Sequence, residues 1–224
     1  MAYSRDEALE LHKDYSETVN NWQYYVRSYN GGYDYTLGQY LNRYNLELDN
    51  EFNQRLANTP CDNHCKNIIQ IYSSFLFRVK ASRDFGGMQD EASLESFLKD
   101  ADLEGNSFTT VMKQAQNYSS IYGHCFLILD KPAVQTNTKA EELEQEIRPY
   151  VSMVTPENVL DWNFERQVNG KYELNYLKIR EEVDKSGGSY MRLWFPDRVD
   201  TIYVEDIGTE PTLIDTATNQ IGKI

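Results

Sequence analysis

The sequence predicts an α+β fold, in which N-terminal helices pack with an antiparallel sheet of about four to six strands. Up to Tyr122, apolar residues recur at spacings of three and four, which is typical of amphipathic helices. After Gly123, short apolar or alternating runs are separated by turn signals such as Asn169-Gly170, which is typical of antiparallel strands. The change falls within residues 118–132, where a helical stripe, a glycine and an apolar run follow one another.

Residues 1–60 are predicted to form a helical arm and a Tyr-rich connector. A helix is expected over residues 4–28, because apolar side chains from Leu9 to Val26 form a stripe, and Gly31-Gly32 ends it. The Tyr-rich connector follows over residues 33–44. A short helix is expected over residues 46–56 and stops before Pro60, because the residue before a proline disfavours helical dihedral angles.

Residues 61–224 are predicted to form a mixed α/β domain, with helices over 61–122 and a sheet over 123–224. Asp62 or Asn63 is a suitable cap for a helix over 63–79, which is apolar on most sides and is therefore expected to be buried or sandwiched between neighbours. A short amphipathic helix is expected around 94–98. A longer helix over 108–122 ends at Gly123, which permits a sharp exit.

The sheet is predicted from several short segments. The run from Cys125 to Leu129 indicates a buried strand, and strands are expected over 151–155 and 159–164. Asn169-Gly170 predicts a two-residue hairpin turn between strands over 164–168 and 171–179. Further strands are expected over 190–195 and 199–204. Residues 136–147 are expected to be an exposed acidic insertion, and the last residues suggest that the chain is part of a longer protein.

Composition excludes several classes of protein. The formal net charge of the 224 residues is −13, which argues against tight wrapping of nucleic acid, because such binding depends on Lys and Arg. No apolar run approaches the ~20 residues of a membrane-spanning helix, so no membrane partner is expected. The N-terminus lacks the apolar core of a signal peptide, and the odd Cys count favours free thiols made in a reducing cytosol. The 17 Tyr suit surfaces that are half buried against a partner.

The best metal candidate is the cluster of Cys61, His64 and Cys65, with His124 and Cys125 as a second cluster. Zinc requires four ligands in a tetrahedron, and the Cys-x-x-His-Cys spacing departs from the common zinc patterns. The alternative is a helix-capping region with small buried thiols. The sequence favours that alternative, so we expect no metal and no cofactor.

No enzyme signature is present in the sequence. There is no phosphate-binding loop, no Gly-x-Gly-x-x-Gly and no Gly-x-Ser-x-Gly. His64 beside Cys65 and His124 beside Cys125 are sequence neighbours, whereas nucleophile and base are usually brought together by the fold. We therefore expect no catalytic residue and a protein that is not an enzyme.

Several segments resemble, in order, the N-terminal part of tailed-bacteriophage portal proteins, the head-to-tail connector family. They include Tyr40-Leu-Asn-Arg43, the run from Asn67 to Phe77, and the helix ending Tyr122-Gly123 with its following strand. The most specific are Arg148-Pro-Tyr150 and Pro156-Glu-Asn-Val-Leu-Asp-Trp162. The resemblance spans most of residues 33–200 and implies the mixed α/β wing of a portal, with stem, clip and crown beyond this chain.

The resemblance implies a structural virion protein, made in the bacterial host cytoplasm. It implies a twelve-subunit ring at one capsid vertex, in contact with the major capsid protein. Terminase is expected to dock on this ring first, and head-completion and tail proteins afterwards. Double-stranded DNA is expected to pass through the channel during packaging and ejection without sequence-specific binding. Ring contacts are expected at Trp22, Tyr40, Phe75 and Phe77. The alternative is an acidic α+β adaptor that binds other proteins without catalysis.

Overall fold

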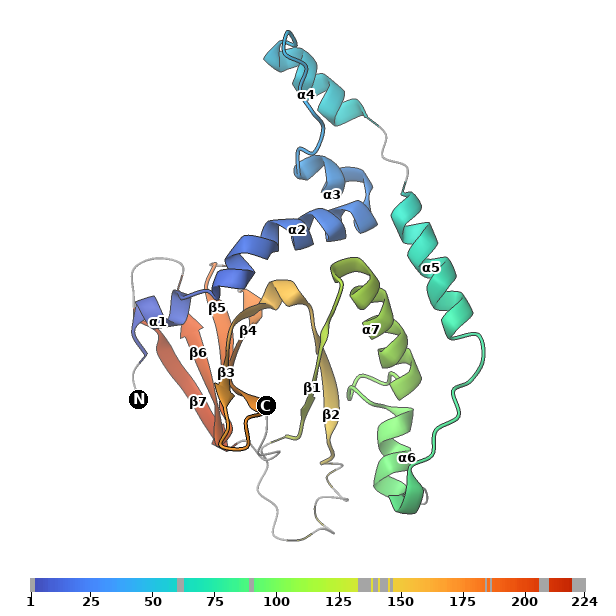
Figure 1. Ribbon diagram of the computed structural model, residues 1–224, viewed down its shortest axis with the longest axis vertical. Helices are drawn as coiled ribbons and strands as arrows, with labels where there is room; N and C mark the ends of the chain where they lie inside the picture. Colours follow the sequence, from blue (N-terminus) through green and yellow to red (C-terminus); the bar gives the residue numbers. More distant parts are fainter. Residues whose placement is uncertain are drawn as a thin grey trace.

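A computed structural model confirms the α+β class (Figure 1). The structure describes residues 3–59, 63–88, 91–132, 138, 141, 145, 147–183, 185, 187–205 and 210–218. Within these residues, seven α-helices precede a two-stranded hairpin and a five-stranded antiparallel sheet. α2 to α7 line the upper and right-hand sides of the view, and the sheet stands at the lower left with α1 beside it.

The helices occupy the N-terminal half of the chain. They are α1 (Arg5–Leu9), α2 (Lys13–Asn30), α3 (Gly32–Leu37), α4 (Asp49–Asn58), α5 (His64–Leu76), α6 (Ala92–Lys99) and α7 (Phe108–Tyr122). Short 3-10 turns occur at η1 (Gly86–Met88) and η2 (Pro156–Asn158).

The strands form two separate sheets. Among the described strands, β1 (Phe126–Asp130) and β2 (Tyr150–Val154) pair only with each other, in antiparallel register. The larger sheet is a meander in which each strand pairs with its chain neighbour: β3 (Val159–Arg166), β4 (Tyr172–Val183), β5 (Ser189–Trp194), β6 (Arg198–Val204) and β7 (Thr212–Thr218). β3 and β7 are therefore the two edge strands.

The main core lies between the N-terminal helices, α7 and the larger sheet. Tyr15 and Trp22 of α2 meet Ile121 of α7, and Met191 and Ile202 of the sheet in this core. The parts predicted as residues 1–60 and 61–224 therefore share a core through α1 and α2. The segment from α3 to α4 extends away from it (Figure 1).

The helix predicted over residues 4–28 is interrupted. Ser4 caps α1, the chain leaves helical geometry at Glu10, and His12 caps α2 through its Nδ1. At the break, the backbone N–H of His12 donates to the carbonyl oxygen of Leu160 in β3, at 3.0 Å. This long-range bond replaces a bond within a helix, which the local apolar spacing does not encode.

The junction around Gly123 is confirmed, with one correction. α7 runs from Phe108 to Tyr122, and Gly123 ends it in the left-handed region with φ 89°. The following strand was predicted to be buried, but β1 alternates between half-buried and exposed positions. The buried-strand interpretation was wrong because β1 belongs to a two-stranded hairpin that is covered on one face only.

The hairpin between β3 and β4 is confirmed, but its turn is longer than predicted. The strands end at Arg166 and resume at Tyr172, and Gly170 N–H donates to Gln167 O. Gly170 has φ 83°, whereas Asn169 does not have a positive φ, so this is not the two-residue turn that requires both. Most of the acidic insertion predicted over residues 136–147 lies outside the described residues.

Candidate functional site

The outer side of α5 carries an apolar stripe that the rest of the described chain leaves exposed. Its members, which we call the α5 face, recur at helical spacing: Ile68, Ile71, Tyr72, Phe75, Leu76 and, just beyond the helix end, Val79. Phe75, near the centre, is 69% exposed. The helix was predicted to be buried or sandwiched between neighbours, but the described chain covers only its inner side.

The inner side of α5 is held firmly. α5 packs against α7 and α2, Ile69 packs against the main core, and Ser73 is fully buried. The Asn63 side chain caps the helix by accepting from Lys66 N–H at 2.9 Å, and it also donates to the carbonyl oxygen of Tyr29 in α2. The exposed stripe therefore stands on a helix of fixed position.

Such a surface is unfavourable in water. Burying one large aliphatic or aromatic side chain stabilises by ~1.5–3 kcal/mol, and contiguous apolar patches on soluble proteins commonly mark interaction sites. A shallow groove of ≈ 560 Å³ runs along α5 and is lined by Asn67, Gln70, Ile71, Ser74, Phe75 and Arg78. Apolar residues bordered by polar ones are typical of protein interfaces.

A second exposed feature is the projecting arm, which we define as residues 38–59. Figure 1 shows α4 at the top of the view, beyond α3 and away from the sheet. The loop before α4 presents Tyr44, Leu46 and Leu48, and Leu46 is 96% exposed. The arm thus offers apolar side chains at a distance from the core.

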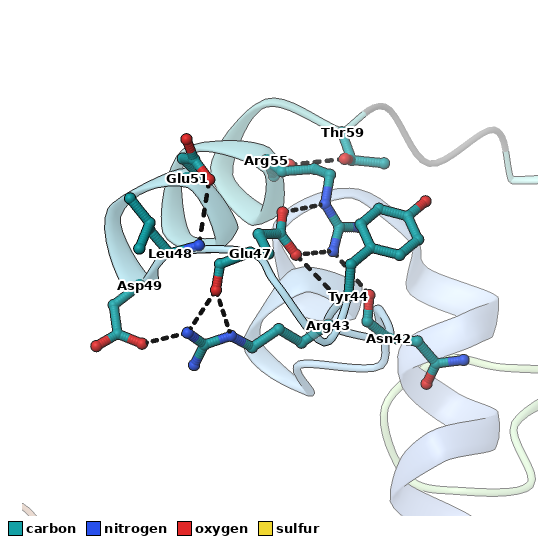
Figure 2. Close-up of polar contacts among 9 residues, drawn as sticks. All are labelled: Asn42, Arg43, Tyr44, Glu47, Leu48, Asp49, Glu51, Arg55 and Thr59. Atoms are coloured by element: carbon teal, nitrogen blue, oxygen red, sulfur yellow. Dashed lines mark hydrogen bonds and ion pairs between the residues drawn. The ribbon is translucent and has the colours of Figure 1, made fainter.

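Charged groups hold the arm in shape (Figure 2). The Arg55 guanidinium donates to both carboxylate oxygens of Glu47, each at 2.8 Å, and lies 4.7 Å from the centre of the Tyr44 ring. Arg43 donates to the Glu47 carbonyl oxygen at 2.8 Å and pairs with Asp49 at 2.6 Å. Hydrogen bonding from Arg55 lowers the pKa of Glu47 to about 2. Bidentate ion pairs of this kind stabilise a segment that has little hydrophobic core of its own.

A polar cleft of ≈ 210 Å³ separates the β1–β2 hairpin from β4 and β5. At its centre the Asp130 carboxylate accepts from Tyr150 Oη at 3.1 Å and from Arg192 at 3.4 Å, and Arg192 also pairs with Glu181 at 3.0 Å. Burial, and then the charge of Asp130, raise the pKa of Tyr150. These groups satisfy one another, so the cleft ties the hairpin to the sheet instead of presenting a free acid or base.

The motif around Glu157 is a structural junction. Tyr122 Oη of α7 donates to its carboxylate at 2.7 Å, Tyr15 Oη of α2 donates to its carbonyl oxygen at 2.9 Å, and Arg180 of β4 donates to the same carbonyl oxygen at 3.2 Å. Burial, followed by the Glu157 hydrogen bond, raises the pKa of Tyr122 above its usual range. The most specific segment of the resemblance thus joins two helices to the sheet.

The first predicted metal cluster is not assembled in the described residues. Cys61 lies outside them, and His64 and Cys65 are both exposed on the first turn of α5. In the described parts of the chain, no three His, Cys, Asp or Glu side chains come together as metal ligands. We therefore assign no metal-binding role to this cluster.

The second cluster is part of the packing. The His124 ring lies between Trp22 and Phe126, with ring centres 5.7 and 5.4 Å away, and burial lowers the pKa of His124. Cys125 Sγ donates to the Ala115 carbonyl oxygen at 3.3 Å. Both side chains are used within the fold.

The structure separates the predicted ring-contact residues. Phe75 lies on the α5 face, and Phe77 is half-buried at the C-terminal cap of α5. Tyr40 is half-buried, and its ring packs against Tyr24 with ring centres 4.7 Å apart.

Trp22 is a core residue, only 7% exposed, and so is not available to contact another molecule. Its aromatic character alone did not distinguish core from surface. The remaining members of the α5 face were missed as site residues, although their spacing of three and four was visible as the helix signal.

Two general findings complete the picture. No helix among the described ranges is long and apolar enough to cross a membrane. Compared with models of protein families and with curated proteins, the sequence gives no match.

Proposed function

We propose that this chain is part of a structural ring subunit, the wing region of a portal-like head-to-tail connector. The observation that carries the proposal is the α5 face, an apolar helix surface fixed on its inner side and exposed on its outer side. Copies arranged around an axis bury such a surface in every subunit. The ordered motifs that resemble portal proteins support the same assignment.

The other features fit a structural role. The arm is held rigid by Arg43, Glu47 and Arg55, so it contacts a neighbour with little loss of conformational freedom. The charged groups of the cleft, Asp130, Arg192 and Glu181, pair with one another instead of facing a substrate. A net charge of −13 suits a conduit along which DNA slides without sticking. Terminase, the capsid protein and tail proteins are the partners that this role entails.

The alternative is an adaptor that binds a different protein through the groove on α5. The groove favours it, since Asn67 and Gln70 offer hydrogen bonds beside Ile71 and Phe75. An adaptor of this kind has no need of self-association. The two functions therefore predict different particle masses for the purified protein, that of a large assembly for the ring subunit and that of a monomer for the adaptor.

Sedimentation velocity of the complete gene product tests the proposal. We expect a single large species at micromolar concentration, which Phe75→Asp converts to monomers because a charge enters the buried contact. Val168→Asp is the matched control, since Val168 is fully exposed in the β3–β4 turn, and it should leave assembly intact. A purely monomeric protein, or assembly equally sensitive to both variants, contradicts the proposal.

A further inference from the structure

The charge around the α5 face differs in sign from that of the chain as a whole. Residues 63–83 contain Lys66, Arg78, Lys80 and Arg83 but neither Asp nor Glu, in a chain of net charge −13. Arg78 and Lys80 are exposed and form no ion pair within the described residues. The surface that needs a partner is therefore apolar and positively charged.

The opposite edge of the molecule has the complementary character. β7 is an edge strand that pairs only with β6 among the described strands, and nearly all of its side chains are exposed, including Leu213 and Ile214. Residues 199–218 contain no Lys or Arg, although Arg5 of α1 donates to Glu205 and Glu210, and Arg198 at the start of β6 pairs with Asp200. We call β7 together with Glu205 and Glu210 the acidic edge.

Asp215 is the acidic residue of this edge best suited to pair with another molecule. Its side chain is exposed and makes no hydrogen bond or ion pair within the described residues. Ile214, next to it, is 54% exposed. The acidic edge thus carries both apolar and negatively charged groups, whereas α5 carries apolar and positively charged ones.

Two α5 faces are poorly suited to each other. A two-fold contact would bring the positive charges of two copies into one interface with no carboxylate from residues 63–83, and like charges across an interface are unfavourable. A contact between unlike surfaces avoids this repulsion and pairs the cations with carboxylates. An exposed edge strand with apolar side chains also needs cover, because it otherwise invites uncontrolled pairing.

We propose that the α5 face of one copy docks on the acidic edge of a second copy of this chain. α5 forms the right-hand edge of the molecule in Figure 1, and β7 lies with α1 at the left-hand edge. Contacts between opposite edges repeat around an axis and close into a ring or continue as a filament. The inference rests on the proposed function, and it identifies which two surfaces meet.

Photocrosslinking in the complete gene product tests this contact. p-Benzoylphenylalanine replaces Phe75 in one preparation and Ile214 in another, and mixing with ¹⁵N-labelled protein identifies links between copies. We expect the Phe75 probe to reach residues 198–218 of another copy, and the Ile214 probe to reach residues 63–83.

The outcomes separate this inference from the proposed function. The protein can form rings in which the Phe75 probe crosslinks to another α5 or to the arm, or in which neither probe crosslinks two copies. Either result overturns the docking arrangement but leaves the proposed ring function standing. Absence of any large assembly overturns both. Capture of the α5 probe by an unrelated protein, without links between copies, favours the adaptor and likewise overturns the inference.

Charge reversal provides a second readout. The double variant Arg78→Glu/Lys80→Glu and the single variant Asp215→Lys should each raise the concentration needed for assembly by about tenfold or more, and combining them should restore part of the loss. Lys171→Glu, at an exposed position in the β3–β4 turn, is the matched control. The contact is contradicted if neither Arg78→Glu/Lys80→Glu nor Asp215→Lys weakens assembly, or if combining them restores none of the loss.

Discussion

Lys178 of β4 donates a hydrogen bond of 2.5 Å to the carbonyl oxygen of Glu10, just past the end of α1. The same ammonium group donates to the Glu7 carbonyl oxygen at 3.1 Å and lies 3.8 Å from the Asp161 carboxylate. The Lys178 side chain is 0% exposed. A buried cation thus satisfies carbonyl groups that the end of a helix leaves free, and it fixes α1 to the sheet.

Replacing Lys178 with Met is expected to destabilise the fold by about 2–4 kcal/mol, because carbonyl oxygens and the Asp161 carboxylate lose their partner. Chemical denaturation measures this loss, and proteolysis near residues 9–12 reports release of α1. Lys171→Met, at an exposed turn position, is the control. Equal stability of the two variants contradicts the anchoring role.

The same lysine predicts a pH effect. Burial lowers the pKa of Lys178 from its ordinary 10.5, so the unfolded state binds the proton more tightly than the folded state. The contribution of this group to stability therefore rises as pH increases toward 10.5. The difference in unfolding free energy between wild type and Lys178→Met should grow with pH in this window. A difference that does not change with pH contradicts the shift.

Tyr122→Phe removes the 2.7 Å hydrogen bond to the Glu157 carboxylate. We expect a loss of about 2 kcal/mol in unfolding free energy, as for other hydrogen bonds to charged groups. Tyr118→Phe is the control, since the Tyr118 hydroxyl makes no hydrogen bond in the described residues, and its effect should stay within about 0.5 kcal/mol. Similar losses in both variants contradict the junction at Glu157.

The Glu47–Arg55 pair predicts the acid behaviour of the arm. Because Arg55 lowers the pKa of Glu47 to about 2, the stabilisation is complete above the ordinary value of 4.5 and is lost as pH falls toward 2. Carboxyl carbon NMR of Glu47 should show a midpoint at about 2. In Arg55→Ala the midpoint should return toward 4.5. A wild-type midpoint near the ordinary value contradicts the pairing.

Gly123→Ala should cost about 1 kcal/mol, because the left-handed φ of 89° disfavours a side chain although no atom lies within 4 Å of the added Cβ. Gly87→Ala is the control, since Gly87 has equal space without a positive φ. Its expected effect is neutral or slightly stabilising. Thermal unfolding distinguishes the two, and a neutral Gly123→Ala contradicts the account of the α7 end.

Much of the fold follows from local signals. The stripe over residues 108–122 and Gly123 define α7 and its end, and the alternating segments predict most of the meander. The break between α1 and α2 was not predictable in this way, because it depends on Leu160 and Lys178, which lie far away in sequence. β7 was missed because Thr212–Thr218 is exposed on both faces and lacks a clear apolar alternation.

The candidate site was predictable only in part. The apolar character of residues 63–79 was evident, but which side of α5 the core covers depends on its packing against α7 and α2. Trp22 and Phe75 are both aromatic residues on helices, yet one is in the core and the other is exposed. Only tertiary structure separates them. The ordered structure of the arm could not be predicted from the sequence either. Its Arg and Glu residues look like ordinary surface charges, and only the structure shows that they pair.

The proposed ring requires that the α5 face is a contact surface between copies of this protein. Electron-microscope projection images of the complete gene product test it most directly. We predict closed rings viewed along a rotational axis, and their loss in Phe75→Asp but not in Val168→Asp. Compact single protomers at all concentrations, or rings that persist unchanged in Phe75→Asp, would contradict the claim.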